Sequence, residues 1–562
     1  MSKLNCSLSL TASILALLVS AAMAGDASSP GVDGDDEPRI INIVNFIRLL
    51  EPRDASITED VLRETVICQI ELMKAHHLPG TFLLQYDALI DPRYQGLLKS
   101  LPRDQFEIGA WWELPQPLVE KAGLKWRGRY PWDWHANVGF VSGYTPEERK
   151  KLVDVYMADF KDVFGYYPKS VASWFIDEHT LTYLHEKYGV IASANCKDQV
   201  GTDGYTLWGG YWNQAYYPSK LNSFMPAQTE EGQIPLPVFR MLGSDPVRQY
   251  STGIGASHQG VISLEPVYRD SGGDTRWVDW FLKNLVEGEC LAFNYAQAGQ
   301  ENSFTWNGMR NGLGYQFPQI AKLRDEGKLR VEKLCESGEW FRRTFKTTPA
   351  TSMAYLKPLK DSDDRAVWFN SRFYRLHVTW DSGRMLIRDV HLFDEAVTSP
   401  IYRERLDAQA VSFLTLPFVD GYYWSSSDRH AGIKLVANID GQDIELQGGA
   451  PSAAEPLPGI LNVTWPLKDR AGQFVITLSE ENADFTLHTS PEIDWSLQLA
   501  VADGVQLPFT RATPKKLSAN FEGSDYQVEL RRGIFHLQGS RLRIQPDCNR
   551  ISLDLSKRRP KP

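Results

Sequence analysis

Between residues 39 and 330, short apolar runs alternate with segments whose apolar residues have helical spacing. The run 39–46 (RIINIVNF) is continuous enough for a strand buried on both faces, and the segment 60–75 has the pattern of an amphipathic helix. Repeated strand–helix units favour a parallel sheet, so we predict an α/β fold, a (β/α)7-8 barrel, with a doubly wound open sheet as the alternative. The predicted strands are 39–46, 81–84, 106–111, 171–176, 190–194, 237–242, 261–264 and 291–294.

The pattern changes from about residue 366, where apolar residues recur at every second position. Two turn signals in this region, 381–383 (DSG) and 438–441 (NIDG), are typical of hairpins. Alternating strands joined by tight turns predict a C-terminal antiparallel β-sandwich. The predicted parts are a signal peptide (1–24), a linker (25–38), a barrel catalytic domain (39–330), a helical bridge (331–365) and a β-sandwich domain (366–562).

The first 24 residues have the pattern of a cleaved export signal, with Lys3, an apolar run at 8–21 and the small-residue site Ala22-Met23-Ala24. We therefore expect a secreted or periplasmic protein, and no later apolar run is long enough to serve as a membrane anchor. A net charge of −10, without a basic stripe that includes aromatic residues, argues against nucleic acid as a partner. The sequence carries no signal for a particular oligomeric state.

Tryptophan is frequent: the chain has 17, of which 11 fall between residues 111 and 306. Neighbouring side chains on a strand point to opposite faces, so we expect either Trp111 or Trp112 to point out of the core. Indole rings suit the C–H faces of sugar rings, and the indole N–H can donate to a hydroxyl. A large aromatic core is the alternative explanation. The tryptophans predicted to bind a carbohydrate substrate are Trp112, Trp134, Trp208 and Trp212.

The stretch 170–189 combines an apolar strand, three polar residues and a helix in one β/α unit. Chemistry in barrels of this kind sits at the carboxyl ends of the strands, where Asp177, Glu178 and His179 fall here. Glu178 fits a solvated acid in the first helical turn, a position that the helix dipole favours. We therefore predict Asp177 as a catalytic carboxylate and His179 as a substrate-binding residue.

The segment 126–135 (WRGRYPWDWH) places charged residues among aromatic ones. Asp133 and His135 leave the same face of an extended chain, and a carboxylate beside an imidazole fixes its tautomer and raises its basicity. The pair is therefore predicted to be catalytic, as an acid or a base. Arg127 and Arg129 could clamp an anionic group, and we assign Arg129 to substrate binding. An ordinary loop salt bridge is the alternative.

Polar residues follow most of the predicted strands, and the ends of barrel strands meet at one mouth. Carboxylates that converge there suit glycoside hydrolysis, which needs one acid and one base or nucleophile. Glu265 is the predicted catalytic partner of Asp177. The other strand-end residues are Glu51 and Gln85, together with five that we assign to substrate binding: Arg48, Glu113, Asp198, Arg240 and Glu301.

Metal chemistry has no support in the spacing of the ligand-type residues. The sequence contains no HxxxH, HExxH or CxxC pattern, and the five cysteines after residue 24 are far apart. We therefore predict neither a metal ion nor another cofactor.

Three features resemble the glycoside hydrolase/deacetylase barrel superfamily, which includes the NodB-like polysaccharide deacetylases and barrel hydrolases of the α-mannosidase and amylase types. Segment 106–109 (FEIG) is similar to a deacetylase segment on strand three. Segments 174–177 and 188–190 are similar to the strand-four unit on which the hydrolases carry a catalytic carboxylate, and the apolar first strand matches in position. The resemblance covers about residues 39–300 and implies a barrel enzyme that acts on carbohydrate.

The sequence departs from the deacetylases at the metal ligands. Those enzymes have an Asp-Asp pair after strand one and a His pair near strand three, whereas segments 45–48 and 110–113 here read NFIR and AWWE. The pattern is closer to metal-free glycoside hydrolases, such as barrel-type inverting sialidases, which use a His/Asp arrangement and arginines on an acidic sugar. We predict an exported glycoside hydrolase, exo-acting on an anionic sugar. The alternatives are a carbohydrate deacetylase or esterase and a non-catalytic glycan-binding protein.

Overall fold

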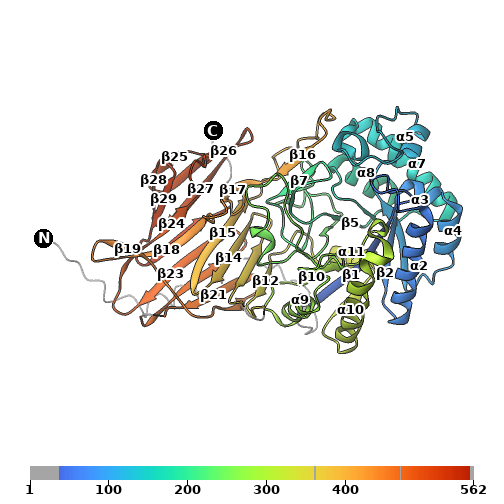
Figure 1. The fold of residues 1–562 in the computed structure, drawn as a ribbon. Coiled ribbons are helices and arrows are strands. Elements are labelled where there is room, and N and C mark those ends of the chain that lie inside the picture. Colours follow the sequence, from blue (N-terminus) through green and yellow to red (C-terminus); the bar gives the residue numbers. More distant parts are fainter. Residues whose placement is uncertain (1–36, 360–361, 469, 557–562) are drawn as a thin grey trace. The chain divides into compact units, whose positions relative to one another are not determined.

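The computed structural model describes residues 37–359, 362–468 and 470–556, so the predicted signal peptide lies outside the described residues. A path of hydrogen-bonded strands, β10-β1-β2-β3-β4-β5-β9-β8, nearly closes into a barrel (Figure 1). The strands from β10 to β9 on this path all pair in parallel, and β8 pairs antiparallel with β9. The mixed α/β fold predicted from strand–helix alternation is confirmed.

Strand β1 (Arg39–Ile47) is buried from its second residue to its last, because both faces of the barrel sheet are covered. This burial accounts for its continuous apolar run. The other strands of the path are β2 (Gly80–Leu84), β3 (Phe106–Trp111), β4 (Ser170–Ala172), β5 (Ala192–Asn195), β8 (Ala215–Tyr216), β9 (Val238–Arg240) and β10 (Asn294–Ala298).

The helices begin where the sequence provides caps. Thr58 accepts from the backbone N–H of Val61 at the start of α2 (Glu59–Ala75), and Thr145 and Glu148 form a capping box at the start of α7 (Pro146–Phe164). In the described ranges, no helix combines the length and apolar character needed to cross a bilayer. The remaining helices are α3 (Tyr86–Ile90), α4 (Pro92–Lys99), α5 (Gln116–Lys121), α6 (Ala136–Gly139), α8 (Glu178–Tyr188), α9 (Thr275–Glu287), α10 (Thr305–Asp325) and α11 (Leu334–Thr344), with 3₁₀ turns η2 (Val141–Gly143), η3 (Gln249–Ser251) and η4 (Asn302–Phe304).

The prediction of a strand at 261–264 is wrong. Ser263 makes only an isolated bridge with Ser244, and the Leu264 N–H donates to the Leu242 carbonyl at 3.0 Å. The Leu264 carbonyl accepts from the side-chain amide of Gln316 at 2.9 Å. Individual hydrogen bonds to backbone and side-chain groups therefore satisfy the backbone N–H and C=O groups of this segment, without a ladder to a neighbouring strand.

The segment 331–365, predicted as a helical bridge, contains more than one kind of element. The preceding helix, α10, ends at Asp325, and Gly327 follows it with φ +71°. The chain then forms β11 (Arg330–Glu332), which pairs with β1, and α11, which packs against β5 and β1. Strand β12 (Thr351–Tyr355) follows and pairs with β13 (Arg365–Asn370).

The C-terminal part consists mainly of two antiparallel sheets, with paths β12-β13-β14-β15-β18-β24-β29-β28 and β20-β21-β22-β23-β30-β27-β26-β25 (Figure 1). Apolar residues of both sheets contribute to one buried core, as in a sandwich. Both predicted hairpins are confirmed. Their central residues all have positive φ, as a type I′ turn requires: Ser382 (51°), Gly383 (75°), Asp440 (52°) and Gly441 (79°).

Elements from the two parts of the chain also pair directly. Strand β16 (Val411–Leu414) runs parallel to β7 (Tyr205–Trp208), which itself pairs with β6 (Gln199–Thr202) in the insertion after β5. The other C-terminal strands are β14 (Tyr374–Asp381), β15 (Arg384–Leu392), β17 (Leu416–Val419), β18 (Gly432–Ile439), β19 (Gln442–Glu445), β20 (Ser452–Leu457), β21 (Ile460–Pro466), β22 (Gly472–Leu478), β23 (Asn482–Thr489), β24 (Asp494–Ala500), β25 (Phe509–Thr513), β26 (Lys516–Phe521), β27 (Ser524–Arg532), β28 (Ile534–Gln538), β29 (Arg541–Gln545) and β30 (Arg550–Asp554).

Candidate functional site

Five side chains that follow strands β1, β2, β3, β4 and β10 meet at the carboxyl end of the barrel. We call Arg48, Gln85, Glu113, Trp174 and Glu301 the rim cluster. Arg48 donates two hydrogen bonds to Glu113, from Nε to Oε2 at 2.9 Å and from Nη2 to Oε1 at 2.7 Å. Glu113 also accepts from Gln85 Nε2 at 2.7 Å and from Trp174 Nε1 at 2.8 Å. The cluster therefore presents a fixed guanidinium that is held from one side by Glu113.

Arg48 remains charged although it is fully buried. Burial acts to lower the pKa of Arg48, but the carboxylates of Glu113 and Glu301 raise it above its ordinary value. The ring centroid of Trp132 lies 4.2 Å from the Arg48 guanidinium carbon and covers it. The positive charge is thus held in place and shielded from water.

Glu301 is the second carboxylate that contacts Arg48. Its Oε2 lies 2.7 Å from Arg48 Nη1, but these two atoms are not aligned for a hydrogen bond. Burial raises the pKa of Glu301 to about 7, even though Arg48 opposes the shift. Near neutral pH, Glu301 is therefore a mixture of acid and carboxylate, the state that suits a group that donates and accepts protons.

Glu265 is connected to Glu301 through Gln300. The Gln300 Nε2 donates to Glu265 Oε1 at 3.0 Å, and its Oε1 accepts from the backbone N–H of Glu301 at 2.9 Å. Ser263 Oγ donates to Glu265 Oε2 at 2.7 Å. Burial raises the pKa of Glu265 and lowers that of nearby Lys197, each as expected for a desolvated charge.

Half-exposed residues surround the rim cluster. Arg53 bonds to Glu51 (Nη2 to Oε2, 2.6 Å) and to Asp203 (Nη1 to Oδ1, 3.0 Å). The Arg53 guanidinium carbon also lies 5.0 Å from the ring centroid of Trp132 and 5.3 Å from that of Trp134. The aromatic loop 126–135 therefore lies against the barrel mouth.

The expected contact between Asp133 and His135 forms, with 2.7 Å between Oδ1 and Nδ1. Arg129 also binds Asp133, from Nε to Oδ2 at 2.9 Å. Burial acts to raise the pKa of Asp133, but its bonds with Arg129 and His135 hold it well below its usual range. Arg129 thus neutralises a carboxylate of its own loop, an arrangement closer to the loop salt bridge than to a free anion clamp.

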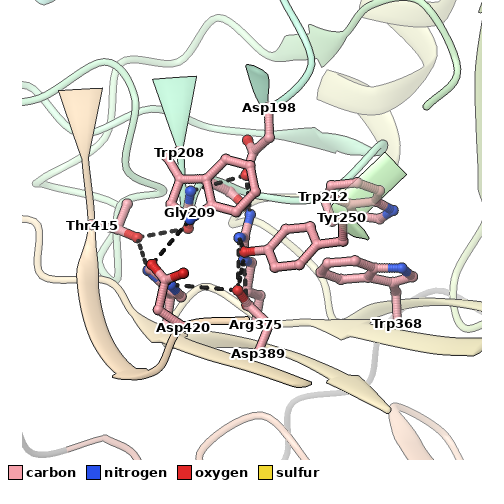
Figure 2. Close-up of polar contacts among 12 residues, drawn as sticks. Asp198, Trp208, Gly209, Trp212, Tyr250, Trp368, Arg375, Asp389, Thr415 and Asp420 are labelled. Atoms are coloured by element: carbon pink, nitrogen blue, oxygen red, sulfur yellow. Dashed lines mark hydrogen bonds and ion pairs between the residues drawn. The ribbon is translucent and has the colours of Figure 1, made fainter. Parts of the chain in front are cut away.

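A second buried group of charges lies where the C-terminal strands β14 and β15 meet the loops after β5 and β9 (Figure 2). We call Asp198, Arg240, Tyr250, Arg375 and Asp389 the junction network. Arg375 contacts Asp198 (Nη1 to Oδ2, 2.5 Å) and Asp389 (Nε to Oδ1, 2.8 Å). Arg240 bonds to the other oxygen of Asp198 at 2.6 Å, and the Tyr250 hydroxyl donates to Asp389. These ion pairs join distant parts of the chain.

Close contacts next to the junction network explain the glycine at 209. Thr415 Oγ1 donates to the Gly209 carbonyl at 2.7 Å and lies 2.8 Å from His391 Nδ1. Gly209 has φ +90°, and a Cβ there would come within 2.0 Å of Thr415 Oγ1. Trp208 Nε1 donates to Asp420 at 3.0 Å, so this indole is also part of the packed junction (Figure 2).

The expectation that one of the paired tryptophans points out of the core is wrong. Trp111 and Trp112 are both 0% exposed, because both faces of β3 are covered. Trp111 stacks on Phe46 at a centroid distance of 3.8 Å, and Trp112 packs against Tyr156 of α7 at 5.7 Å. Of the four tryptophans predicted to contact sugar, only Trp134 is half-exposed; Trp112, Trp208 and Trp212 are buried.

Asp177 occupies the N-cap of α8. Its Oδ1 accepts from the backbone N–H groups of His179 and Thr180, both at 3.1 Å, and from Arg149 Nη1 at 2.9 Å. In the part of the chain that the structure describes, no hydrogen bond or ion pair joins it to the rim cluster. This position suits a neutralised helix cap and does not support catalysis. His179 Nε2 bonds to the Tyr402 carbonyl at 2.8 Å, also outside the cluster.

The expectation that Glu178 is solvated is wrong. It is fully buried and accepts from the Ser223 N–H at 3.2 Å and from Ser399 Oγ at 2.9 Å. Burial, reinforced by the charge of neighbouring Asp177, raises the pKa of Glu178 to about 8. The start of α8 lies under the loops that carry Ser223 and Ser399. The helix dipole there acts on a buried carboxyl, and not on the solvated one that we expected.

Glu178→Gln is expected to remove part of the pH dependence of stability. A carboxyl whose pKa is higher in the folded than in the unfolded protein contributes stability that is complete below the unfolded value of about 4.5 and is lost towards pH 8. Between these limits, the unaltered protein should lose up to about 1.4 kcal/mol more per pH unit than the variant. Urea denaturation measures the slopes, and exposed Glu186→Gln on the same helix is the control. Equal slopes for the Glu178→Gln variant and the unaltered protein would contradict this assignment.

The residues at the barrel mouth do not fit a deacetylase metal site. Within 37–359, 362–468 and 470–556, no three His, Cys, Asp or Glu side chains are close enough to hold a metal ion. At the rim, Arg48 already lies 2.7 Å from oxygens of both Glu113 and Glu301. Because a second cation would be repelled by this guanidinium, we derive no step that uses a metal.

The structure divides the predicted site residues into several groups. The rim cluster unites Arg48, Glu113 and Glu301, with Glu265 connected through Gln300. The junction network contains Asp198 and Arg240. The residues outside both groups are Asp133, His135, Arg129 and Trp134 in the loop beside the rim, Trp208 and Trp212 beside the junction, and Asp177, His179 and Trp112.

Four polar residues beside or within the junction network were missed: Arg375, Asp389, His391 and Asp420. A weak signal exists on two otherwise apolar strands. Arg375 and His377 are two positions apart on β14, and Asp389 and His391 are two positions apart on β15. Such residues share one face of their strand. Polar residues at those positions therefore indicate a buried polar contact, but not its partner.

No protein-family profile and no curated protein sequence matches the chain. Among solved structures, a glycoside hydrolase/deacetylase candidate from Parabacteroides distasonis aligns over 70% of this chain and 94% of its own, with 16% identity and a TM-score of 0.55. The two proteins share a fold. A polysaccharide deacetylase candidate from Mycobacterium smegmatis (13% identity, 57% of this chain, 95% of its own, TM-score 0.36) and PuuE allantoinase (12%, 57%, 96%, 0.35) are also similar.

Proposed function

We propose that the chain is an exported hydrolase that cleaves a carbohydrate at the rim cluster, with Glu301 as its acid–base group. Glu301 carries the proposal. It follows a barrel strand, it touches a fixed guanidinium, and burial gives its carboxyl a pKa of about 7. Hydrolysis needs a group that can give a proton to the leaving oxygen and take one from water near neutral pH.

Glu265 is the second carboxyl in this proposal. Cleavage of a glycosidic bond requires two carboxyl groups, one of which acts as acid and the other as base or nucleophile. Gln300 and Ser263 fix both oxygens of Glu265, and Gln300 also bonds to the backbone of Glu301. A substitution that removes the hydrogen bonds of Gln300 should therefore shift the positions of both Glu265 and Glu301.

Glu113 holds Arg48 in position. Its two hydrogen bonds with Arg48 leave the guanidinium little freedom, so the charge beside Glu301 is preorganised. As Glu301 loses its proton, Arg48 stabilises the resulting carboxylate without a rearrangement. Glu113 is a positioning residue in this account.

The half-exposed residues around the rim are the proposed contacts for the sugar. Trp134 is half-exposed although Arg53 and Arg129 pack on its ring, and the Arg53–Asp203 ion pair beside it would supply polar groups. The narrower prediction of an anionic sugar has less support, because Arg129 and Arg240 each bind a carboxylate of the chain itself. The proposals that the enzyme is exo-acting and that it is exported rest on the sequence pattern alone.

A carbohydrate deacetylase is the second candidate, and the shared fold with the Parabacteroides distasonis protein favours it. The two candidates differ in product: a glycoside hydrolase releases new reducing ends, whereas a deacetylase releases acetate. The guanidinium of Arg48 at the mouth favours the first, because it already pairs with the carboxylates of Glu113 and Glu301 and would repel a bound cation beside them.

On a panel of polysaccharides and acetylated glycans, we expect the protein to release reducing ends in the presence of EDTA at the same rate as in its absence. The reason is that the proposed groups, Glu301 and Glu265, act without a metal. Reducing-end and acetate assays on the same samples measure both products. Acetate release that EDTA abolishes and zinc restores would replace glycoside hydrolysis with deacetylation as the function.

A further inference from the structure

The segment that follows Glu265 forms a tight turn that keeps Tyr268 close to it. The Tyr268 N–H donates to the Glu265 carbonyl at 3.5 Å, and the Tyr268 carbonyl accepts from the Gly273 N–H at 2.8 Å. The Tyr268 ring meets the ring of Phe304 edge-on, with 6.3 Å between the centroids. Phe304 ends η4, the turn that directly follows Glu301. The Tyr268 ring therefore lies where the two chain segments that carry Glu265 and Glu301 meet.

The Tyr268 hydroxyl is open to solvent. Tyr268 as a whole is half-buried. In the described ranges its hydroxyl makes no hydrogen bond, and it is not one of the buried side-chain atoms that lack a partner. Tyr205 of β7 shows the opposite arrangement: it is 1% exposed, and its hydroxyl accepts from Gln199 Nε2 at 2.6 Å. A ligand can therefore reach the Tyr268 hydroxyl without displacing a protein group from it.

Two carboxyl groups keep this hydroxyl protonated. Burial raises the pKa of Tyr268 above its ordinary value, and the negative charges of Glu265 and Glu301 raise it further. The phenol is therefore a neutral donor throughout the pH range in which Glu301, with a pKa of about 7, changes its charge. An ionised carboxylate can only accept, and the Arg48 guanidinium is 0% exposed. Tyr268 thus provides an exposed hydrogen-bond donor beside both carboxyl groups.

We propose that Tyr268 is a third catalytic residue, whose hydroxyl donates a hydrogen bond to a sugar hydroxyl on the carbon next to the scissile bond. A sugar whose scissile bond lies between Glu265 and Glu301 brings that hydroxyl towards Tyr268. Hydrogen bonds to this part of a sugar strengthen as the transition state forms, so the contact lowers the barrier as well as binding the substrate. The inference rests on the proposed function, because it takes the rim cluster as the place where the glycan is cleaved.

Tyr268→Phe removes only the hydroxyl. We expect kcat/KM for the best glycan of the panel to fall about tenfold, the effect of one hydrogen bond in the transition state. The melting temperature should shift by less than about 2 °C, because the hydroxyl bonds to no described residue. Tyr315→Phe on α10, whose hydroxyl bonds to Asp279, is the matched control and should retain full activity. A fall in kcat/KM of less than about threefold for Tyr268→Phe would overturn the proposal, and so would a large loss of stability.

A deoxy substrate tests the contact itself. An aryl glycoside that lacks the hydroxyl on the carbon next to the scissile bond removes the proposed partner of Tyr268. This change should lower kcat/KM at least about threefold less in the Tyr268→Phe variant than in the unaltered protein, because the variant has already lost the contact. Equal losses in both proteins would place Tyr268 away from that hydroxyl and would contradict the proposal.

Glu301→Gln separates this inference from the proposed function. An active Glu301→Gln variant beside a slow Tyr268→Phe variant would count against Glu301 and for Tyr268, and the reverse result would count the other way. If no glycan of the panel is cleaved, the proposed function fails, and NMR titration with cellotetraose, chitotetraose and trigalacturonate becomes the test. Tyr268→Phe should then bind at least one of them severalfold more weakly than the unaltered protein does. Equal binding, or no binding of any, would overturn this inference as well.

Discussion

Glu301→Gln should lower kcat/KM for the cleaved glycan at least about 100-fold, because glutamine can neither donate nor accept the proton that hydrolysis transfers. Glutamine has nearly the same shape and can still lie beside Arg48, so the fold should be retained. Steady-state kinetics on the best substrate from the glycan panel, together with a thermal melt of the variant, measures both expectations. Exposed Glu186→Gln is the matched control and should leave the rate unchanged. Activity within about threefold of the unaltered protein would remove Glu301 from the mechanism.

The same assignment fixes the pH dependence of the rate. If protonated Glu301 is the acid, activity should be highest on the acid side of its pKa of about 7 and fall about tenfold per pH unit above it. The Glu301→Gln variant should not show this alkaline limb.

Arg375→Met should destabilise the folded protein by about 3–5 kcal/mol, the range found when one partner of a buried ion pair is removed. Arg375 is 0% exposed and contacts both Asp198 and Asp389, which would be left as buried carboxylates with fewer partners. Urea denaturation at neutral pH measures the free energy of unfolding.

Arg384→Met on β15 is the control for this prediction, because Arg384 is exposed. Its effect on stability should stay within about 0.5 kcal/mol. A loss below about 1 kcal/mol for Arg375→Met would show that the junction network contributes little to holding β14 against the loop after β5.

Local signals in the sequence predicted the barrel framework well. Strand β3 (Phe106–Trp111) has the predicted bounds, and α2 (Glu59–Ala75) lies where the amphipathic pattern at 60–75 predicted a helix. Both features depend on neighbouring residues only, through apolar runs and helical spacing. Segment 261–264 has the same apolar character but forms no strand, because whether a run joins a ladder depends on distant partners such as Gln316.

The clustering of candidate residues at the barrel mouth was predicted only in part, for a related reason. A position after a barrel strand was a sound guide to Arg48, Glu113 and Glu301, since strand ends converge. The same rule did not distinguish Asp177, whose Oδ1 accepts from Arg149 and from the start of α8. Burial of that kind comes from tertiary contacts with residues far away in the chain.

The tryptophans show the limit of composition as a guide. Their number suggested sugar stacking, yet Trp212 stacks on Trp368 at a centroid distance of 3.9 Å, and Trp208 bonds to Asp420. Both partners come from the C-terminal strands or their connecting loops, and no local pattern in the insertion after β5 identifies them. Composition correctly indicated aromatic packing in this region but did not distinguish a ligand surface from a junction.

A crystal structure of the Glu301→Gln variant soaked with an intact oligosaccharide substrate is the most direct test of catalysis at the rim cluster. We expect the oxygen of the scissile bond to lie about 3 Å from the side chain of residue 301, with a sugar ring against Trp134. An oligosaccharide bound away from the barrel mouth, with residue 301 and Arg48 untouched, would contradict the proposed site.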